Sequence, residues 1–125
     1  MINLITLLLE NKLDAAIKVS LEKFIQSKER NTWISNRIFK LYVRNANRYL
    51  PDGAVYKSLD IASIDVEKKG QGVFTSILNI AESLCKIHHV DIIYVESILN
   101  PRLIPFLEKR GYVYIETNNS MYKKI

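Results

Sequence analysis

One continuous stretch, residues 59–78, constrains this chain more than any other. It begins at Leu59 as an apolar run that predicts a β-strand, and it crosses a turn that holds Gly70 and Gly72. Beyond the turn, apolar residues recur at the spacing of a helix that packs one face on a core: Phe74, Ile77, Leu78, Ala81, Leu84 and Cys85. Glycines let a ligand touch bare backbone, and a helix start offers unpaired N–H groups and a partial positive charge. The stretch therefore predicts an anion site, whose usual occupant is a phosphate or pyrophosphate.

The spacing of the glycines excludes two nucleotide-binding motifs. A P-loop needs Gly, four residues and then Gly-Lys-Ser/Thr, and the sequence has no such run. A Rossmann fingerprint needs a third glycine where this chain has Thr75. The segment Lys69–Phe74 instead resembles the acetyl-CoA loop of the GNAT acetyltransferase superfamily, with the motif Arg/Gln-x-x-Gly-x-Gly/Ala. Gly72 matches the middle glycine, while Lys69 stands in for Arg and Phe74 replaces the final small residue.

A second motif extends this resemblance toward the C-terminus. The run Val90–Ser97 predicts a strand, and a short helix follows it. The next segment is similar to the GNAT pattern of an Asn, a Tyr-Glu-Lys helix and a closing Gly-aromatic pair. The residues that fall in register are Asn100, Phe106, Glu108, Lys109 and Gly111-Tyr112. The resemblance thus covers residues 57–115, with two motifs in the right order and a correct gap between them.

The fold class that the resemblance implies is α+β, a GNAT-like three-layer fold. Its central sheet is mixed and mostly antiparallel, with a split between two strands and helices on both faces. Patterns in the sequence predict helices over 11–27 and near 102–109, strands around 36–50, 55–65 and 92–96, and a terminal hairpin over 112–115 and 121–124. The apolar run over residues 2–9 is compatible with either a strand or a helix, and its leucines favour a helix. No linker divides the chain, so we expect a single domain over residues 1–125.

The cofactor that the resemblance implies is acetyl-CoA, with its pantetheine lying as an extra strand in the split. On this chain the split falls between the strands that end near Ile64 and near Glu96. Backbone N–H groups from Ile64 to Val66 would then face the thioester oxygen. The pyrophosphate would lie on Lys69, Gly70, Gln71, Gly72, Val73 and Phe74. Phe106 belongs to the second motif, and Asn100 would either contact the cofactor or cap the short helix after it.

The side chains of catalysis are less closely determined. Leu107 occupies the position where many GNAT enzymes carry the tyrosine that protonates the leaving thiolate, so Ser97, Tyr94 and Tyr112 are the nearest candidates. Glu96 follows an apolar strand, where desolvation would raise the pKa of its carboxyl toward that of a general base. The alternative is that Glu96 pairs with an arginine. Asp60 and Asp65 are weaker candidates for the base, and both favour a structural role.

The resemblance implies an acetyl-CoA-dependent N-acetyltransferase, in which an amine acceptor attacks the thioester directly. Two alternatives stay open: an acyl-CoA-binding module with impaired catalysis, and a GNAT-fold enzyme that modifies nucleic acid. The formal net charge is +5, with basic residues recurring from Lys28 to Arg48, so an acidic or nucleic-acid partner is compatible and a polyamine is disfavoured. A homodimer is also compatible with the sequence.

The remaining features are consistent with a cytoplasmic protein. The apolar N-terminus lacks a basic lead and a cleavage site, so we expect neither a signal peptide nor a membrane span. The single cysteine, Cys85, excludes an internal disulfide, and its helical spacing predicts a buried side chain. His88 and His89 are adjacent and have no accompanying ligand set, so we expect no metal site.

Overall fold

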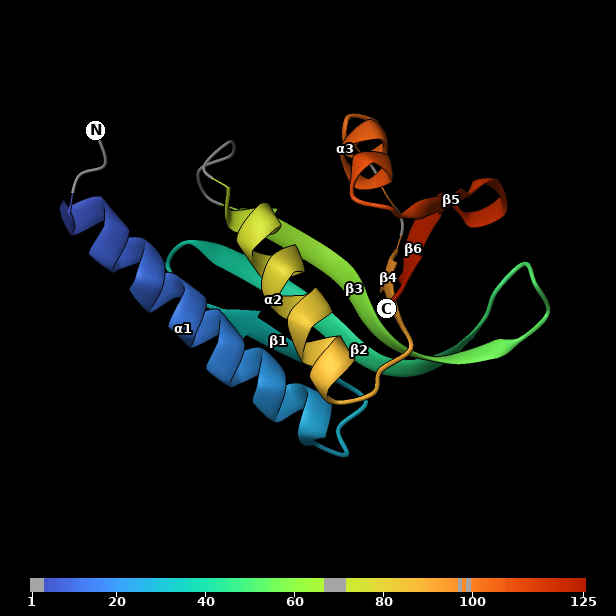
Figure 1. Ribbon diagram of the computed structural model, residues 1–125, viewed down its shortest axis with the longest axis horizontal. Helices are drawn as coiled ribbons and strands as arrows, with labels where there is room; N and C mark the ends of the chain where they lie inside the picture. The colour runs from blue at the N-terminus through green and yellow to red at the C-terminus, as the bar shows by residue number, and fades with distance from the viewer. Residues whose placement is uncertain (1–3, 67–71, 97, 99) are drawn as a thin grey trace.

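The computed structural model describes residues 4–66, 72–96, 98 and 100–125 (Figure 1). In chain order the elements are α1 (Leu4–Gln26), β1 (Asn31–Ser35), β2 (Phe39–Tyr49), β3 (Val55–Val66), α2 (Val73–Ile87), β4 (Ile92–Val95), α3 (Leu103–Lys109), β5 (Val113–Ile115), the 3-10 helix η1 (Glu116–Asn118) and β6 (Ser120–Lys124). Within these ranges, no helix combines the length and the apolar character needed to cross a membrane.

The strands form one six-stranded sheet in the order β1-β2-β3-β4-β6-β5. Only β3 and β4 run parallel, and α2 is the crossover between them. Their ladder is short, because Ser58–Ile61 of β3 pairs with the whole of β4 and β3 then continues to Val66 paired with β2 alone. The chain after β4 turns away: the Glu96 N–H donates to Ile61 O at 3.0 Å, but the Ile98 N–H donates to Asn119 O at 2.8 Å. The predicted split is this divergence of β3 from β4.

A β-bulge lies in β3 close to the divergence. Tyr42 of β2 stands opposite Ser63, whereas Val43 stands opposite Ile61, so Ala62 is the extra residue. Leu59 and Ile61 are buried before the bulge, and Ile64 and Val66 pack against the same core after it. The bulge therefore changes which alternate residues of β3 face the core. Bulges also bend and twist the strand that carries them, which suits a strand that leaves its neighbour.

Helices α1 and α2 lie side by side over one face of the sheet (Figure 1). The predicted apolar face of α2 is confirmed, since Ile77, Leu78, Ala81, Leu84 and Cys85 are all buried. They pack on inward-facing residues of the central strands and of β6: Leu41, Val43, Leu59, Ile61, Ile93, Val95 and Met121. Helix α3 packs against β5 and contributes Leu107 to this core.

The α+β class and the mixed, mostly antiparallel sheet are confirmed, and two elements differ from the sequence predictions. The helix predicted over 11–27 is longer, because α1 begins at Leu4 and includes most of the ambiguous N-terminal run. Strand β1 was not predicted, because Asn31–Ser35 is short, mostly polar and lies at the edge of the sheet. A turn at Pro51-Asp52-Gly53 joins β2 to β3, with the Gly53 N–H donating to Leu50 O at 2.9 Å.

Candidate functional site at the split between two strands

The edge of β3 beyond Ile61 is the first part of the candidate site. The parallel ladder with β4 ends at the pair Ile61 and Val95. From Ala62 to Val66 the side of β3 that faces β4 has no ladder partner among the described residues. The side chains of Ile64 and Val66 are half-buried against the core, which fixes the strand in place. Unpaired N–H and C=O groups on a fixed strand can hold an extended ligand as an added strand.

The start of α2 is the second part. Gly72 is the residue that precedes the helix, and its φ of 73° and ψ of 10° lie in the left-handed region, which favours glycine. A Cβ atom placed on Gly72 would meet no atom within 4 Å, so the space beside it is open. The first helical hydrogen bond runs from the Ser76 N–H to Gly72 O at 3.0 Å, and the N–H groups before Ser76 point along the helix axis. Lys69, Gly70 and Gln71 lie outside the described residues.

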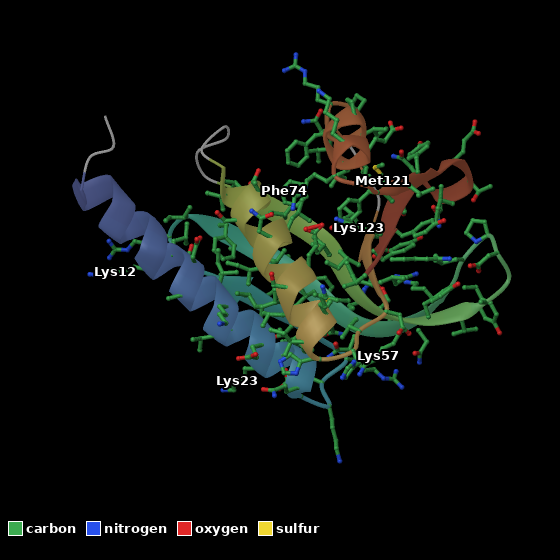
Figure 2. The ribbon with its side chains drawn as sticks, viewed as in Figure 1. Lys12, Lys23, Lys57, Phe74, Met121 and Lys123 are labelled. Carbon is green, nitrogen blue, oxygen red and sulfur yellow. The ribbon has the colours of Figure 1, made fainter. Side chains whose placement is uncertain are left out.

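Two phenylalanines join the two sequence motifs. Phe74 lies on the first turn of α2 (Figure 2), and Phe106 lies on α3. Their ring centroids are 6.0 Å apart with an interplanar angle of 33°. Both rings are half-buried and pack against the core, so Phe74 lies inward although it replaces the small residue of the motif. Val73 is buried in the same core.

Asn100 shapes the approach to α3. Its side-chain Oδ1 accepts the Arg102 N–H at 3.0 Å, and its carbonyl oxygen accepts the Leu103 N–H at 3.0 Å. This is an Asx-type turn, in which a short polar side chain satisfies backbone donors at the entry to a helix. The capping alternative for Asn100 therefore has a contact in the structure, and a role toward the cofactor stays a prediction.

A network of charges lies where β4 ends. The guanidinium of Arg44 contacts the carboxylate of Glu96, and Nη2 of Arg48 lies 3.9 Å from the same carboxylate. Both arginines come from β2, two strands away from β4 in the sheet. The arginine partner that the sequence left open for Glu96 is therefore Arg44. The role of Glu96 as a general base stays a prediction, and Ser97 lies outside the described residues.

Asp60 anchors the two arginines. Its side chain is 0% exposed, and its Oδ2 accepts bonds from Arg48 Nε at 3.1 Å and from Arg48 Nη2 at 2.5 Å. Its Oδ1 accepts the Ser58 hydroxyl at 2.6 Å, and Arg44 Nε lies 3.7 Å from Oδ2. The hydrogen bond to Asp60 raises the pKa of the Arg48 guanidinium above its ordinary value, which keeps it charged. Asp60 is thus a structural anchor, while Asp65 is exposed on β3.

The tyrosines considered as proton donors are engaged elsewhere. Leu107, at the position of the family's tyrosine, is 0% exposed in the core. The Tyr112 hydroxyl donates to Glu82 at 3.3 Å, and burial, followed by the charge of Glu82, raises the pKa of Tyr112 above its ordinary value. The Tyr94 hydroxyl accepts a bond from Asn118 at 2.7 Å, and its ring lies under the guanidinium of Arg48 at 4.4 Å.

The grouping of Arg44 and Arg48 with Asp60 and Glu96 was not predicted from the sequence. Their positions on a basic strand were clear, because basic and apolar residues alternate from Arg37 to Arg44. What the sequence does not contain is the pairing that sets Arg44 opposite Asp60 and brings both near the end of β4. Knowledge of that register would have been enough to group Arg44, Arg48, Asp60 and Glu96.

Comparisons with known proteins agree on the fold. The sequence matches no protein-family model and no curated protein at a significant level. Its structure is similar to a putative acetyltransferase from Agrobacterium tumefaciens, with a TM-score of 0.54 and 17% identity over 100% of this chain and 95% of that one. It is also similar to Arabidopsis thaliana Naa50 in complex with a bisubstrate analogue, CoA-Ac-MVNAL, with a TM-score of 0.51 and 19% identity over 70% of this chain.

A third similar structure is a mutant of the AtaT toxin bound to the C-terminus of the antitoxin AtaR, with a TM-score of 0.53 and 15% identity over 70% of this chain. The chain spans 58% of the length of that AtaT chain and 66% of the Naa50 chain. Sequence identities this low show that the folds are similar, and they show nothing about activity or substrate. The split sheet, the glycine at the start of α2 and these likenesses together show that the chain has the fold of the GNAT acetyltransferases.

Proposed function

We propose that this protein is an acetyl-CoA-dependent N-acetyltransferase, in which an amine acceptor attacks the thioester directly. The observation that carries the proposal is the divergence of β3 from β4 in a GNAT fold, with Gly72 opening α2. A similar fold, that of Naa50, holds a bisubstrate analogue that contains CoA. These features support binding of an extended, phosphorylated cofactor.

The described residues fit acetyl-CoA in two places. The unpaired edge of β3 at Ile64 and Val66 offers backbone groups to the pantetheine, and Gly72 leaves open space beside a helix start where a phosphate is favoured. The loop from Lys69 to Phe74 would hold the pyrophosphate, with Asn100 and Phe106 nearby in the second motif. When bound, acetyl-CoA supplies an activated acetyl group.

The catalytic roles that we propose belong to Glu96 and Ser97. Transfer requires a neutral amine, so a base must accept the proton that the amine loses, directly or through a water. Glu96 stands at the end of β4, and its contact with Arg44 fixes the position of its carboxylate. Ser97 would supply the proton for the leaving thiolate, because Leu107 has no proton to give and the Tyr112 hydroxyl donates to Glu82.

The second candidate function is an acyl-CoA-binding module with impaired catalysis. The observation that favours it is the burial of Leu107 where the family has a tyrosine. The two candidates differ in turnover and agree on cofactor binding. An assay of thioester cleavage with a panel of amines separates them, because a binding module would bind acetyl-CoA and release no free thiol.

The acceptor and the place of action follow from bulk charge and from the cysteine. A net charge of +5 favours an acceptor with negative groups over a polyamine. Burial, followed by the charge of Glu82, raises the pKa of the Cys85 thiol to about 12, so this cysteine is inert. A lone, buried cysteine favours a reducing compartment, and we propose the cytoplasm.

The test of the proposal is calorimetric titration with acetyl-CoA. Gly72→Asp should weaken binding strongly, because it adds a negative charge where the phosphates would lie. Gly53→Asp is the matched control, since Gly53 also has a positive φ, of 83°, and open space beside it, in the β2–β3 turn. The cofactor assignment is wrong if the parent does not bind acetyl-CoA, or if both variants bind it as tightly as the parent.

A further inference from the structure

The excess positive charge of this protein is confined to one β-hairpin and its flanks. Residues 28–48 hold six basic side chains and one acidic side chain, Glu29, a formal net charge of +5. The whole chain has eighteen basic and thirteen acidic residues and the same net charge, so the rest of the chain balances at twelve of each. A chain that is neutral apart from one strongly basic hairpin presents a local electrostatic surface for an anion.

Not all of these cations are neutralised within the protein. Arg44 and Arg48 are offset by Glu96 and Asp60. The others are exposed, and none makes an ion pair with a described residue: Lys28, Arg30, Arg37 and Lys40. Lys28 and Arg30 precede β1, while Arg37 lies in the turn between β1 and β2 and Lys40 lies at the start of β2. Uncompensated positive charge therefore lies at both ends of the hairpin.

Between these ends lies an exposed pair of aromatic rings. Trp33 on the edge strand β1 is 58% exposed, which is unusual for the largest side chain in proteins. It stands opposite Tyr42, and the two ring centroids are 4.9 Å apart. The guanidinium of Arg44 lies 5.9 Å from the centroid of the Tyr42 ring. Trp33, Tyr42, Arg44 and Lys40 share one face of the sheet, because alternate residues of a strand point the same way.

We propose that this face, defined by Trp33, Lys40, Tyr42 and Arg44, binds single-stranded nucleic acid. A base would stack on Trp33, and phosphates would pair with the exposed cations at either end of the hairpin. Aromatic rings within a basic groove are the physical basis of single-strand binding, because every unpaired base offers a flat face. A duplex hides those faces, so the exposed ring favours a single strand.

The surface is continuous with the proposed catalytic site, since Arg44 touches both the Tyr42 ring and Glu96. A single strand lying along this face would bring an attached amine toward Glu96. The inference rests on the proposed acetyl transfer for the identity of the acceptor, which would be an amine carried by a nucleic acid. The binding itself does not depend on the transfer.

The only tryptophan of the chain is Trp33, so its fluorescence reports on this surface alone. Titration of the full chain with a single-stranded oligonucleotide of mixed sequence should quench that fluorescence, with an affinity that falls steeply as salt rises. In an anisotropy assay with a labelled oligonucleotide, Trp33→Ala should weaken binding by about 5- to 150-fold. Trp33→Phe should recover most of the affinity, because a phenyl ring still stacks.

Matched controls separate stacking from general effects. Tyr49 is 78% exposed on the same strand, β2, but points to the other face, so Tyr49→Ala should bind as the parent does. Lys40→Glu should weaken binding and reduce its dependence on salt. Lys12→Glu on α1 (Figure 2) makes the same charge change on a helix and should have little effect.

Three results would overturn the inference even if the parent binds the oligonucleotide. The first is binding of a base-free polyphosphate as tight as that of the oligonucleotide, and the second is a preference for duplex over single strand. The third is a change of oligomeric state on Trp33→Ala, which would make the face a contact between copies of this chain. Calorimetry with acetyl-CoA keeps the two proposals apart. A parent that binds acetyl-CoA but no oligonucleotide loses only this inference, and the converse result removes only the proposed transfer.

Discussion

Two carboxylates in this protein are each held by two cations, and their surroundings differ. Glu82 on α2 bonds to Arg110 at 2.7 Å and to Lys123 at 2.9 Å, and Asp60 on β3 holds Arg48 and Arg44. The partners of Glu82 join α2 to the end of α3 and to β6, and the Arg110 guanidinium also bonds to Asn79 of α2. The arginines of Asp60 continue to Glu96, where β3 and β4 diverge. The same arrangement of charges thus serves packing in one region and reaches the candidate site in the other.

The largest effect on activity should come from Glu96→Gln, which removes the negative charge that Arg44 contacts at the end of β4. If Glu96 is the general base, turnover should fall by about 10²–10⁴-fold while acetyl-CoA affinity is unchanged. Steady-state rates and calorimetry measure the two quantities. Glu82→Gln is the control, since its network does not reach the split, and its turnover should match that of the parent. An equal loss of turnover in both variants would mean that Glu96 affects activity only by stabilising the fold.

The second prediction compares the stability contributed by the two networks. Asp60→Asn leaves two arginines beside a neutral, fully buried side chain, and it should lower the free energy of unfolding by about 3 kcal/mol. Glu82→Gln should cost less, about 1–2 kcal/mol, because the Glu82 side chain and its cations are partly exposed. Urea denaturation of both variants tests this order. A reversed order would make the Glu82 network the stronger support of the fold.

The third prediction concerns Asn100, at the start of the helix whose end carries Arg110 toward Glu82. Asn100→Ala removes the acceptor of the Arg102 N–H and should cost about 0.5–2 kcal/mol of stability. If Asn100 contacts the cofactor instead, acetyl-CoA affinity should fall at an unchanged melting temperature. Melting curves and calorimetry on one variant distinguish the two roles. No change in either would remove Asn100 from both the helix entry and the site.

The smallest effect is expected at an exposed carboxylate, Asp52, in the β2–β3 turn. The Tyr56 hydroxyl, then the Ala54 N–H and then Lys124 lower the pKa of Asp52 from 3.8 to about 2. A lowered folded-state pKa stabilises the fold above the unfolded value, and this contribution is lost as the pH falls from about 4 to about 2. Asp52→Asn should therefore flatten the pH dependence of the urea midpoint in that window only. An unchanged pH profile would show that these hydrogen bonds do not persist in solution.

Much of the fold could be predicted from the sequence where one periodicity governs a segment. The spacing of Ile77, Leu78, Ala81 and Leu84 predicted a buried helix face, and all four side chains are buried. Strand β1 could not be predicted, because an edge strand buries little and Asn31–Ser35 has no strong alternation of apolar residues. The single tryptophan in this segment, Trp33, does not by itself distinguish a strand from a loop.

The candidate site was predicted in outline, and its charges were not. The glycines and the strand before them indicated an anion site at a helix start, and the split was implied by the resemblance that these residues carry. Whether Glu96 would meet an arginine depended on which residues of β2 lie opposite Asp60, and that is set by the register of strands distant in sequence. Local patterns do not encode such pairing.

The bulge at Ala62 shifts the in-and-out alternation of the β3 side chains by one residue. Before it, odd-numbered residues such as Leu59 and Ile61 enter the core, and after it even-numbered residues such as Ile64 and Val66 do so. Ala62 pairs with no residue of β2, so deleting it would keep Val43 opposite Ile61 and Tyr42 opposite Ser63, with Ile64 and Val66 still facing the core. The deletion would remove only the bulge and the bend that it gives the strand, and a thermal melt of the deletion beside Ala62→Gly would measure what the bulge contributes to stability. The bulge therefore sets the path by which β3 leaves β4, while the pairing with β2 decides which side chains of β3 enter the core.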